Sequence, residues 1–307
     1  MTDRPIHNVA ASVRQRLMNR AKASGRPFQE VLQYFAMERF LYRLSKSPHG
    51  DRFILKGALM FTVWGAPASR PTRDIDLLAY LNNDLAAIVP VIRDICRQDV
   101  EPDGVTFDVD TLTGEVIKEA ADYSGVRVTF SGYLQNARIA MQIDIGFGDV
   151  VEPAAKLIDY PTILELAGPR LRAYPKETVV AEKYEAMVKL GQLNSRMKDF
   201  FDLWMLSRQF AFDGPLLATA VSRTFANRQT ALNSNPVAFT PEFVGDSMKQ
   251  TQWRGYLRKS KLEIAPTDLA QVIASIHDFL APLTEALVAG QPFDMKWEPS
   301  GPWSERR

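Results

Sequence analysis

Two aspartates alternate with apolar residues in the stretch RPTRDIDLLAY, which spans residues 70–80. In an extended strand, side chains two residues apart point to the same face, so Asp74 and Asp76 would share one face, opposite to Ile75. Two neighbouring carboxylates repel each other unless a cation or a shared proton offsets their charge. The pattern therefore predicts a metal-binding or acid–base site on this strand, the alternative being a solvated strand end.

A third aspartate departs from an apolar pattern in the same way. In the stretch ARIAMQIDIGFG, residues 137–148, apolar side chains at every second position alternate with Ala140, Gln142 and Asp144. Three carboxylates on strands of one sheet could hold two Mg²⁺ ions roughly 3.5–4 Å apart, a separation suited to displacement at phosphorus. Hard oxygen ligands suit Mg²⁺, which takes its other ligands from water and substrate phosphates.

Hydrophobic periodicity predicts the elements that would position these carboxylates. The predicted strands span 74–80, 105–112, 126–134 and 137–148, with a hairpin turn at LQNA between the last two, and a short buried strand turns into a helix at Gly57 within 52–65. The predicted helices span 9–25, 27–47, 83–98, 176–191, 196–210, 213–226, 240–257 and 267–288. Pro90 leaves the continuity of the third of these helices open. Residues 152–175 are expected to form a connection.

The composition is that of an ordinary globular protein, with 46% hydrophobic and 24% charged residues. The longest apolar run, LAAIVPVI at 85–92, is too short for a transmembrane helix. The first residues lack the basic-then-apolar order of a signal peptide, so we expect a cytoplasmic location. The only cysteine, Cys96, excludes an internal disulfide, and three scattered histidines argue against a zinc site.

The net charge of +1 conceals an asymmetry along the chain. Residues 1–56 carry 11 basic and 4 acidic side chains, whereas residues 74–160 carry 6 basic and 16 acidic ones. A basic segment beside an acidic one suits a protein that binds a polyanion and also holds metal ions. Arg14, Arg16 and Arg20 on the first predicted helix are therefore candidate RNA-binding residues, the alternative being a solvated helix face.

Several motifs in a fixed order resemble a known family. Gly57 before a helix, Asp74 and Asp76 on the next strand and Asp144 on a later one resemble the polymerase-beta-type nucleotidyltransferase pattern. More narrowly, the motifs LKGALMFTVWG, RPTRDIDL, AEKYEAMVKLG and RMKDFFDLWML resemble the AbiEii/AbiGii-type toxins. Those are nucleotidyltransferase-fold toxins of bacterial toxin–antitoxin and phage-defence systems. The resemblance covers nearly the whole chain.

This resemblance implies an α+β fold, with a nucleotidyltransferase-like mixed β-sheet, flanking helices and a C-terminal helical domain. We expect a basic helical arm at residues 1–50 and a catalytic core at 51–160. A helical domain at 161–290 would complete the nucleotide site, and a loosely attached tail would occupy 291–307.

The resemblance also implies roles for individual residues. Asp74, Asp76 and Asp144 would be catalytic and bind Mg²⁺, two ions being expected, and Asp144 would also help to deprotonate the attacking hydroxyl. The residues expected to contact the nucleotide are Lys56, Gly57, Thr72, Lys183, Lys198, Asp199 and Asp202. Gly57 would open the helix whose N-terminus faces the triphosphate. Lys183 would neutralise phosphate charge.

Some alternatives stay open within this resemblance. Ala58 stands where many relatives carry a second glycine or a serine, so a hydroxyl contact to phosphate would be lost there. Thr72 stands where some relatives carry a serine, and its modification is open. Lys183 could instead pair with Glu182 on a helix surface. Asp199 or Asp202 could be a surface partner of a neighbouring basic residue.

The sequence therefore predicts a Mg²⁺-dependent nucleotidyltransferase toxin that transfers a nucleotide from an NTP to a hydroxyl of a nucleic acid. The resemblance favours the 3′ end of tRNA as acceptor and implies a cognate antitoxin as partner. Two alternatives remain: a small-molecule nucleotidyltransferase of the antibiotic-modifying type, and an NTP-dependent protein that phosphorylates itself or a partner.

Overall fold

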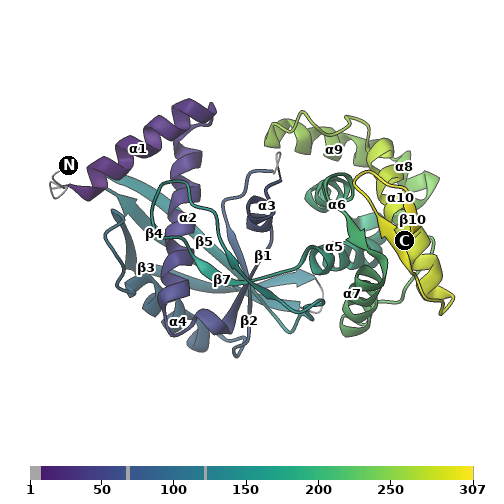
Figure 1. The fold of residues 1–307 in the computed structure, drawn as a ribbon, viewed down its shortest axis with the longest axis horizontal. Coiled ribbons are helices and arrows are strands. Elements are labelled where there is room, and N and C mark those ends of the chain that lie inside the picture. Colours follow the sequence, from purple (N-terminus) through teal and green to yellow (C-terminus); the bar gives the residue numbers. More distant parts are fainter. Residues whose placement is uncertain (1–7, 67–69, 121–122, 307) are drawn as a thin grey trace. The chain divides into compact units, whose positions relative to one another are not determined.

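The computed structural model describes residues 8–66, 70–120 and 123–306, so the start of the predicted arm (1–7) and part of the loop before Asp74 (67–69) lie outside the described residues. The chain divides into two compact units (Figure 1). The sheet unit comprises Met1–Gly65, Pro71–Gly148 and Lys156–Ala173, and the helical unit comprises Ala66–Arg70, Asp149–Ala155 and Tyr174–Arg307. Each unit is thus assembled from segments that are separated in sequence.

A mixed sheet, seven-stranded over the described residues, forms the centre of the sheet unit. In spatial order its strands are β3 (Val105–Ala120), β4 (Tyr123–Leu134), β5 (Ala137–Phe147), β2 (Ile75–Ala79), β1 (Phe53–Lys56), β7 (Arg170–Ala173) and β6 (Lys156–Asp159). β2 pairs in parallel with β5, and β1 pairs in parallel with β7, whereas the other neighbours are antiparallel. This confirms the predicted α+β class with a mixed sheet.

Long antiparallel pairings build one side of this sheet. β4 and β5 meet at the predicted LQNA turn, where Leu134 pairs with Ala137. β3 continues well beyond its predicted end at residue 112, because its register with β4 resumes at Thr113 after an irregularity. Thr113, Glu115 and Val116 are all exposed, so no inside–outside alternation marked this part of the strand in the sequence.

Two short strands lie in the segment that was expected to be a connection. β6 and β7 pair with each other, and Ala173 of β7 also pairs with Leu55 of β1. On β7 only Leu171 and Ala173 are buried, and no residue of β6 is buried. Strands that bury so few side chains give no periodic signal, so the expectation of a connection over 152–175 was wrong.

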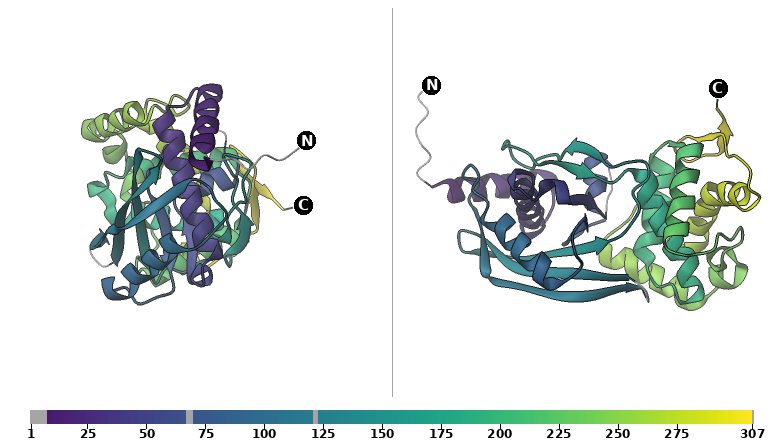
Figure 2. Two further views of the ribbon diagram at one scale, coloured as in Figure 1. Left: turned by 90° about the vertical axis from the view of Figure 1, so that its left-hand side faces the viewer. Right: turned by 90° about the horizontal axis from the view of Figure 1, so that it is seen from below.

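Helices α2 (Phe28–Lys46) and α4 (Leu85–Arg97) pack on the sheet, and α1 (Val9–Ser24) packs on α2 (Figure 2). The core between these helices and the sheet contains fully buried residues, among them Leu32 and Phe35 of α2, Ile92 of α4 and Ile143 of β5. The short 3-10 helix η1 (Gly50–Arg52) precedes β1, and the five-residue α3 (Leu59–Val63) follows it. α4 runs through Pro90 without interruption, which answers the question that the sequence left open.

The helical unit contains most of the remaining secondary structure. Its helices are α5 (Lys176–Leu190), η2 (Gly191–Leu193), α6 (Met197–Gln209), α7 (Gly214–Asn227), η3 (Val237–Phe239), α8 (Pro241–Val244), α9 (Ser247–Ser260) and α10 (Leu269–Val288). The expectation of a single helix over 240–257 was wrong, because two helices, α8 and α9, occupy this segment. Asp246 interrupts it as the N-cap of α9, where its carboxylate accepts from the Met248 and Lys249 amides at 2.7 and 3.3 Å. In the described part of the chain, no helix combines the length and apolar character that a bilayer crossing needs.

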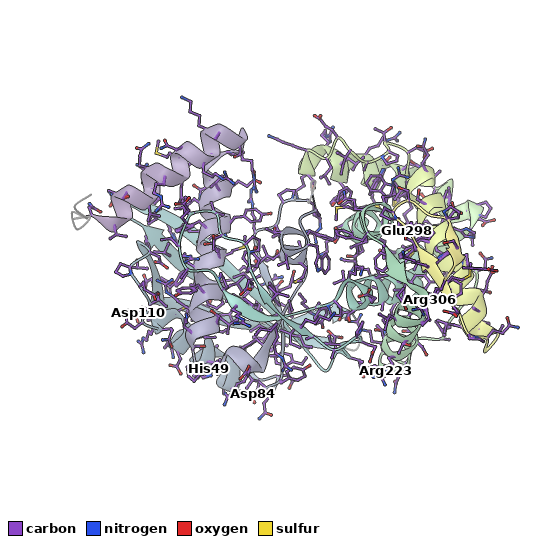
Figure 3. All side chains as sticks on the ribbon, in the orientation of Figure 1. His49, Asp84, Asp110, Arg223, Glu298 and Arg306 are labelled. Atoms are coloured by element: carbon purple, nitrogen blue, oxygen red, sulfur yellow. The ribbon has the colours of Figure 1, made fainter. Side chains whose placement is uncertain are left out.

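The last residues are held firmly in the helical unit rather than loosely attached. β9 (Met295–Trp297) pairs with β8 (Phe212–Asp213) and β10 (Trp303–Glu305) in a small sheet. The Trp297 indole is buried and donates to the Ser207 carbonyl at 2.6 Å, while the Trp303 indole donates to the Phe279 carbonyl at 2.8 Å. Arg306, labelled in Figure 3, pairs with two carboxylates of the same unit. The expectation of a loose tail was therefore wrong.

Candidate active site

Three carboxylates converge on one face of the sheet. Asp74 directly precedes β2, Asp76 lies on β2, and Asp144 lies on β5, the parallel neighbour of β2. Asp76 and Asp144 are register partners, and one oxygen from each of the three carboxylates lies within 4.8 Å of the others. The structure thus brings together the three residues that the sequence indicated. Their binding of a metal stays a prediction.

Burial of the opposite face fixes this arrangement. The apolar residues that flank Asp76 and Asp144 along their strands belong to the same core as the buried side of α2; they are Ile75, Leu77, Ile143 and Ile145. A shift of either strand by one residue would expose these side chains and bury the carboxylates. The alternation seen in the sequence therefore determines which face carries the cluster.

Gly57 makes room for the carboxylate of Asp76. Its φ of +73° lies in the left-handed region, and a Cβ at this position would lie 1.9 Å from Oδ2 of Asp76. Any side chain at residue 57 would therefore collide with Asp76. The structure gives Gly57 this steric role, whereas its predicted contact with phosphate stays a prediction. Ala58 is the N-cap residue of α3 and makes no side-chain cap.

Thr72 and α2 hold the chain in place just before β2. The Thr72 hydroxyl donates to Oδ1 of Asp74, and the Thr72 amide donates to the hydroxyl of Tyr34 at 3.1 Å. Gln33 of α2 donates to the carbonyls of Arg73 and Ala140 at 3.4 and 3.0 Å. The buried Thr72 side chain therefore helps to orient Asp74, and α2 links the segment before β2 to β5.

Arg127 on β4 is a residue of this cluster that the sequence analysis missed. Its guanidinium donates from Nε to Oδ1 of Asp144 at 2.8 Å and from Nη2 to Oδ2 at 2.7 Å. The amide of Gln142 donates to the same two oxygens at 3.2 and 3.3 Å. The hydrogen bonds to Asp144 raise the pKa of the Arg127 guanidinium, so this side chain stays charged. Counting outward from the LQNA turn pairs Arg127 with Asp144, so the sequence did contain this signal.

A row of five charged residues crosses five adjacent strands. Register partners run from Glu115 on β3 through Arg127 on β4, Asp144 on β5 and Asp76 on β2 to Lys56 on β1. Directly opposite residues on neighbouring strands point to the same face, so this charge row crosses the face that carries the carboxylates. It holds three negative and two positive side chains, a balance of −1, and two like charges meet in it only where Asp76 faces Asp144.

A second cluster of predicted residues lies within the helical unit. Nζ of Lys183 on α5 lies 2.7 Å from Oδ1 of Asp199 and 2.9 Å from Oδ2 of Asp202, both on α6. Asp202 is fully buried and also accepts from Nε of Arg70 at 3.1 Å, a partner that the sequence did not reveal. The alternative in which Lys183 forms a surface pair with Glu182 was wrong. Lys198 is exposed, outside this cluster of direct ion pairs.

The pKa values in this second cluster follow from its paired charges. Burial acts to lower the pKa of Lys183, but Asp199 and Asp202 outweigh it and hold that pKa above its ordinary value. Burial acts to raise the pKa of Asp199, but Lys183, together with the nearby charges of Lys198 and Arg196, outweighs it and holds that pKa below its ordinary value. Both members of the pair are therefore charged at neutral pH.

The family model described as nucleotidyl transferase AbiEii toxin, type IV toxin–antitoxin system, matches residues 39–280 of the 307-residue chain. The chain belongs to the AbiEii nucleotidyl transferase toxin family. Membership of the AbiEii family confirms the resemblance found in the sequence, and it implies nucleotidyltransferase activity and an antitoxin partner. None of the curated proteins matches the chain significantly.

Two solved structures from Helicobacter pylori are similar to this AbiEii-family chain. One is provisionally classed as a nucleotidyltransferase, with a TM-score of 0.49 and 15% identity over 84% of this chain and 97% of its own. The other is JHP933, with a TM-score of 0.46 and 16% identity over 86% of this chain and 98% of its own.

The predicted RNA-binding residues of this AbiEii-family chain lie on α1. Val13 and Leu17 are buried where α1 packs on α2, which leaves Arg14 and Arg20 exposed and Arg16 half-buried. The Arg14 guanidinium also lies 5.8 Å from the centroid of the Phe28 ring. The charges of α1 are thus accessible on a helix that is fixed to the core, and their contact with RNA stays a prediction.

Proposed function

We propose that this AbiEii-family protein transfers a nucleotide from an NTP to the 3′-terminal hydroxyl of tRNA, with Mg²⁺ bound by Asp74, Asp76 and Asp144. The observation that carries the proposal is the convergence of three carboxylates on one sheet face in a chain of a nucleotidyltransferase family. Action on tRNA would take place in the cytoplasm.

The residues present fit a magnesium site. Three carboxylates offer hard oxygen donors, which is the ligand type that Mg²⁺ prefers. Asp144 accepts two short hydrogen bonds from Arg127 and two longer ones, of 3.2 and 3.3 Å, from Gln142, so a cation bound at Asp144 would take the place of the longer Gln142 contacts. The missing side chain at Gly57 is what allows Asp76 to occupy its position in the cluster. When bound, the metal would neutralise charge on the phosphates during the transfer.

The reaction exchanges one phosphoester bond for another. The acceptor oxygen forms a bond to the α-phosphorus of the NTP, and the bond from that phosphorus to the bridging oxygen breaks, which releases pyrophosphate. The hydroxyl proton passes to a carboxylate oxygen of Asp144. Such transfers depend mainly on positioning and charge neutralisation, and we assign positioning to Thr72 through its hydrogen bond to Asp74.

We further propose that Lys56 and Gly57 of the sheet unit contact the nucleotide. A separate proposal, for the helical unit taken by itself, is that Lys183, Lys198, Asp199 and Asp202 form a nucleotide-contacting cluster. Lys56 lies opposite Asp76 in the charge row, where a cation can balance phosphate charge. The buried charges around Lys183 are costly to maintain, and perturbed ionisable groups of this kind often belong to functional sites.

The basic helix α1 supports a nucleic acid as acceptor. The sequence places an excess of seven positive charges in residues 1–56, from 11 basic and 4 acidic side chains. Arg14 and Arg20 are exposed, as phosphate contacts require. A small acceptor would have no use for a basic helix of this kind.

The test is the chemical state of tRNA ends in cells that express the protein. We expect added nucleotides on tRNA 3′ ends with the wild type, detected by mass spectrometry or sequencing of the ends, and none with Asp76→Asn. Asp159→Asn is a matched control, because it makes the same change at an exposed carboxylate of the same sheet, on β6, three strands away from β2. Unaltered tRNA together with loss of growth would point to another acceptor, and a fully toxic Asp76→Asn variant would exclude the catalytic assignment.

A further inference from the structure

Arg127 occupies both oxygens of Asp144, one of the three carboxylates that the proposed function assigns to metal. We infer that Arg127 is a positioning residue whose charge keeps the affinity of the cluster for a free divalent ion low, so that the ion is held stably only together with the nucleotide. This inference rests on the proposed function, since it presupposes a metal at Asp74, Asp76 and Asp144.

The geometry is that of a strong and specific ion pair. Two parallel hydrogen bonds of 2.8 and 2.7 Å join the Arg127 guanidinium to Asp144. Bidentate pairs of this type fix the orientation of the carboxylate as well as balancing its charge. The side chain of Asp144 is 11% exposed and that of Arg127 is 33% exposed, so water only partly screens the pair. Arg127 therefore acts directly on the field that a cation at Asp144 experiences.

The charge row shows how far the cluster is already neutralised. Three carboxylates alone would present three negative charges to an ion. Arg127 and Lys56 are the register partners on the two outer sides of Asp144 and Asp76, so the three carboxylates together with these two cations carry a charge of −1. A divalent ion alone thus meets a weakly charged site. A triphosphate brings both negative charge and oxygen ligands, which are what Mg²⁺ lacks at this site.

A purely orienting role for Arg127 predicts the opposite result. If the guanidinium served only to hold Asp144 in a ligating position, its removal would weaken metal binding. If its charge sets the affinity, its removal tightens binding. The two roles predict opposite changes in metal affinity when Arg127 is replaced. A measurement of metal affinity therefore separates them without any measurement of nucleotide transfer.

The experiment titrates Mn²⁺ into the full-length protein, followed by electron paramagnetic resonance or calorimetry. For Arg127→Gln we expect Mn²⁺ to bind more tightly than to the wild type, on the order of tenfold, as loss of one unit charge a few ångströms from a divalent ion would give. Arg127→Lys keeps the positive charge but cannot form the two parallel hydrogen bonds of the guanidinium. It should bind Mn²⁺ as weakly as the wild type. Arg138→Gln is the matched control, because Arg138 is an exposed arginine on the same face of β5 that bonds Ser131 rather than the cluster. Its Mn²⁺ affinity should not change.

The same titration with a non-hydrolysable NTP analogue separates this inference from the proposed function. If the wild type binds Mn²⁺ neither alone nor with the analogue, both the metal assignment and the inference fail. If the wild type binds Mn²⁺ with the analogue and Arg127→Gln binds Mn²⁺ alone no more tightly than the wild type, only the inference fails. Circular dichroism checks the fold, and should Arg127→Gln not fold, weakened Mn²⁺ binding by Arg127→Lys would overturn the inference.

Discussion

Asp76 and Asp144 lie directly opposite each other on adjacent parallel strands, so two like charges face each other across the sheet. Like charges in this position destabilise a sheet by up to about 1 kcal/mol. A protein selected only for stability would not keep both. The pair is therefore best understood as a cost that is retained for function.

This relationship leads to the first prediction. Asp76→Asn should leave the free energy of unfolding unchanged or raise it by up to about 1 kcal/mol in metal-free buffer, because it removes the repulsion. The same variant should lose nucleotide transfer. Chemical denaturation and a transfer assay measure the two effects. A clear loss of stability would mean that the attraction between Asp76 and its neighbours, such as Lys56 on β1, outweighs the repulsion by Asp144.

A second prediction concerns the collision at residue 57. Gly57→Ala should destabilise the protein by more than Gly25→Ala, although both glycines have a positive φ, of 73° and 67°. The backbone strain alone costs about 1–3 kcal/mol at either position. Only at residue 57 does the new Cβ meet another group, the Asp76 carboxylate, whereas nothing lies within 4 Å at residue 25. Equal losses of stability for the two variants in denaturation experiments would contradict the steric role of Gly57.

A third prediction concerns the buried cluster of the helical unit. Lys183→Met should cost about 3–5 kcal/mol, because it leaves buried Asp199 with only the 4.0 Å contact to Arg196 and Asp202 with Arg70. Lys198→Met removes the same charge from an exposed position on α6 and should change stability by less than about 0.5 kcal/mol. Urea denaturation of both variants decides this. If Lys183→Met is as stable as the control, Lys183 is not the structural partner of these carboxylates.

A fourth prediction is a dependence on pH. Because the folded pKa of Asp199 lies below its ordinary value, the unfolded chain takes up a proton first as the pH falls. Stability from this group is complete above the ordinary Asp pKa of about 3.9 and is lost as the pH falls through the folded value. Melting temperatures should therefore fall more steeply for the wild type than for Asp199→Asn as the pH drops below about 4, and the two curves should run parallel above about pH 5. Curves that stay parallel throughout would exclude Asp199 as a contributor.

The fifth prediction tests α1. Changing Arg14, Arg16 and Arg20 together to Gln should weaken tRNA binding and flatten the dependence of log K on log salt by roughly two to three units. NTP binding should remain. The control replaces three exposed basic residues of α9, Arg254, Arg258 and Lys259, which changes the net charge equally. RNA affinity measured at several salt concentrations gives the answer, and an equal effect of both triple changes would remove α1 from any specific role.

Much of the site was predictable because its signals are local. The alternation around Asp76 and Asp144 depends only on the period of a strand, and burial of the intervening isoleucines and leucines confirms it. Arg127 was overlooked because its importance depends on pairing across a hairpin rather than on its own neighbours. Arg70 could not be foreseen, since its contact with Asp202 joins residues that are distant in the sequence.

The errors in the fold also have a physical cause. Four strands are short, namely β6, β7, β9 and β10. Contacts with distant parts of the chain stabilise them, so they leave no periodic pattern in the sequence. Trp297 and Trp303 are examples, since each indole donates to a carbonyl from a distant helix. The break between α8 and α9 depends on the cap that Asp246 provides, a signal that the apolar pattern of the surrounding helix concealed.

The order of the strands has a consequence for synthesis on the ribosome. β5 lies between β2 and β4 in the sheet, although it follows both in the chain. Asp144 is thus translated long after Asp74 and Asp76, and it can join them only when β5 has been inserted beside β2. A nascent chain that ends before β5 carries two of the three carboxylates without the third. An antitoxin that acted during translation would meet a polypeptide whose cluster is still incomplete.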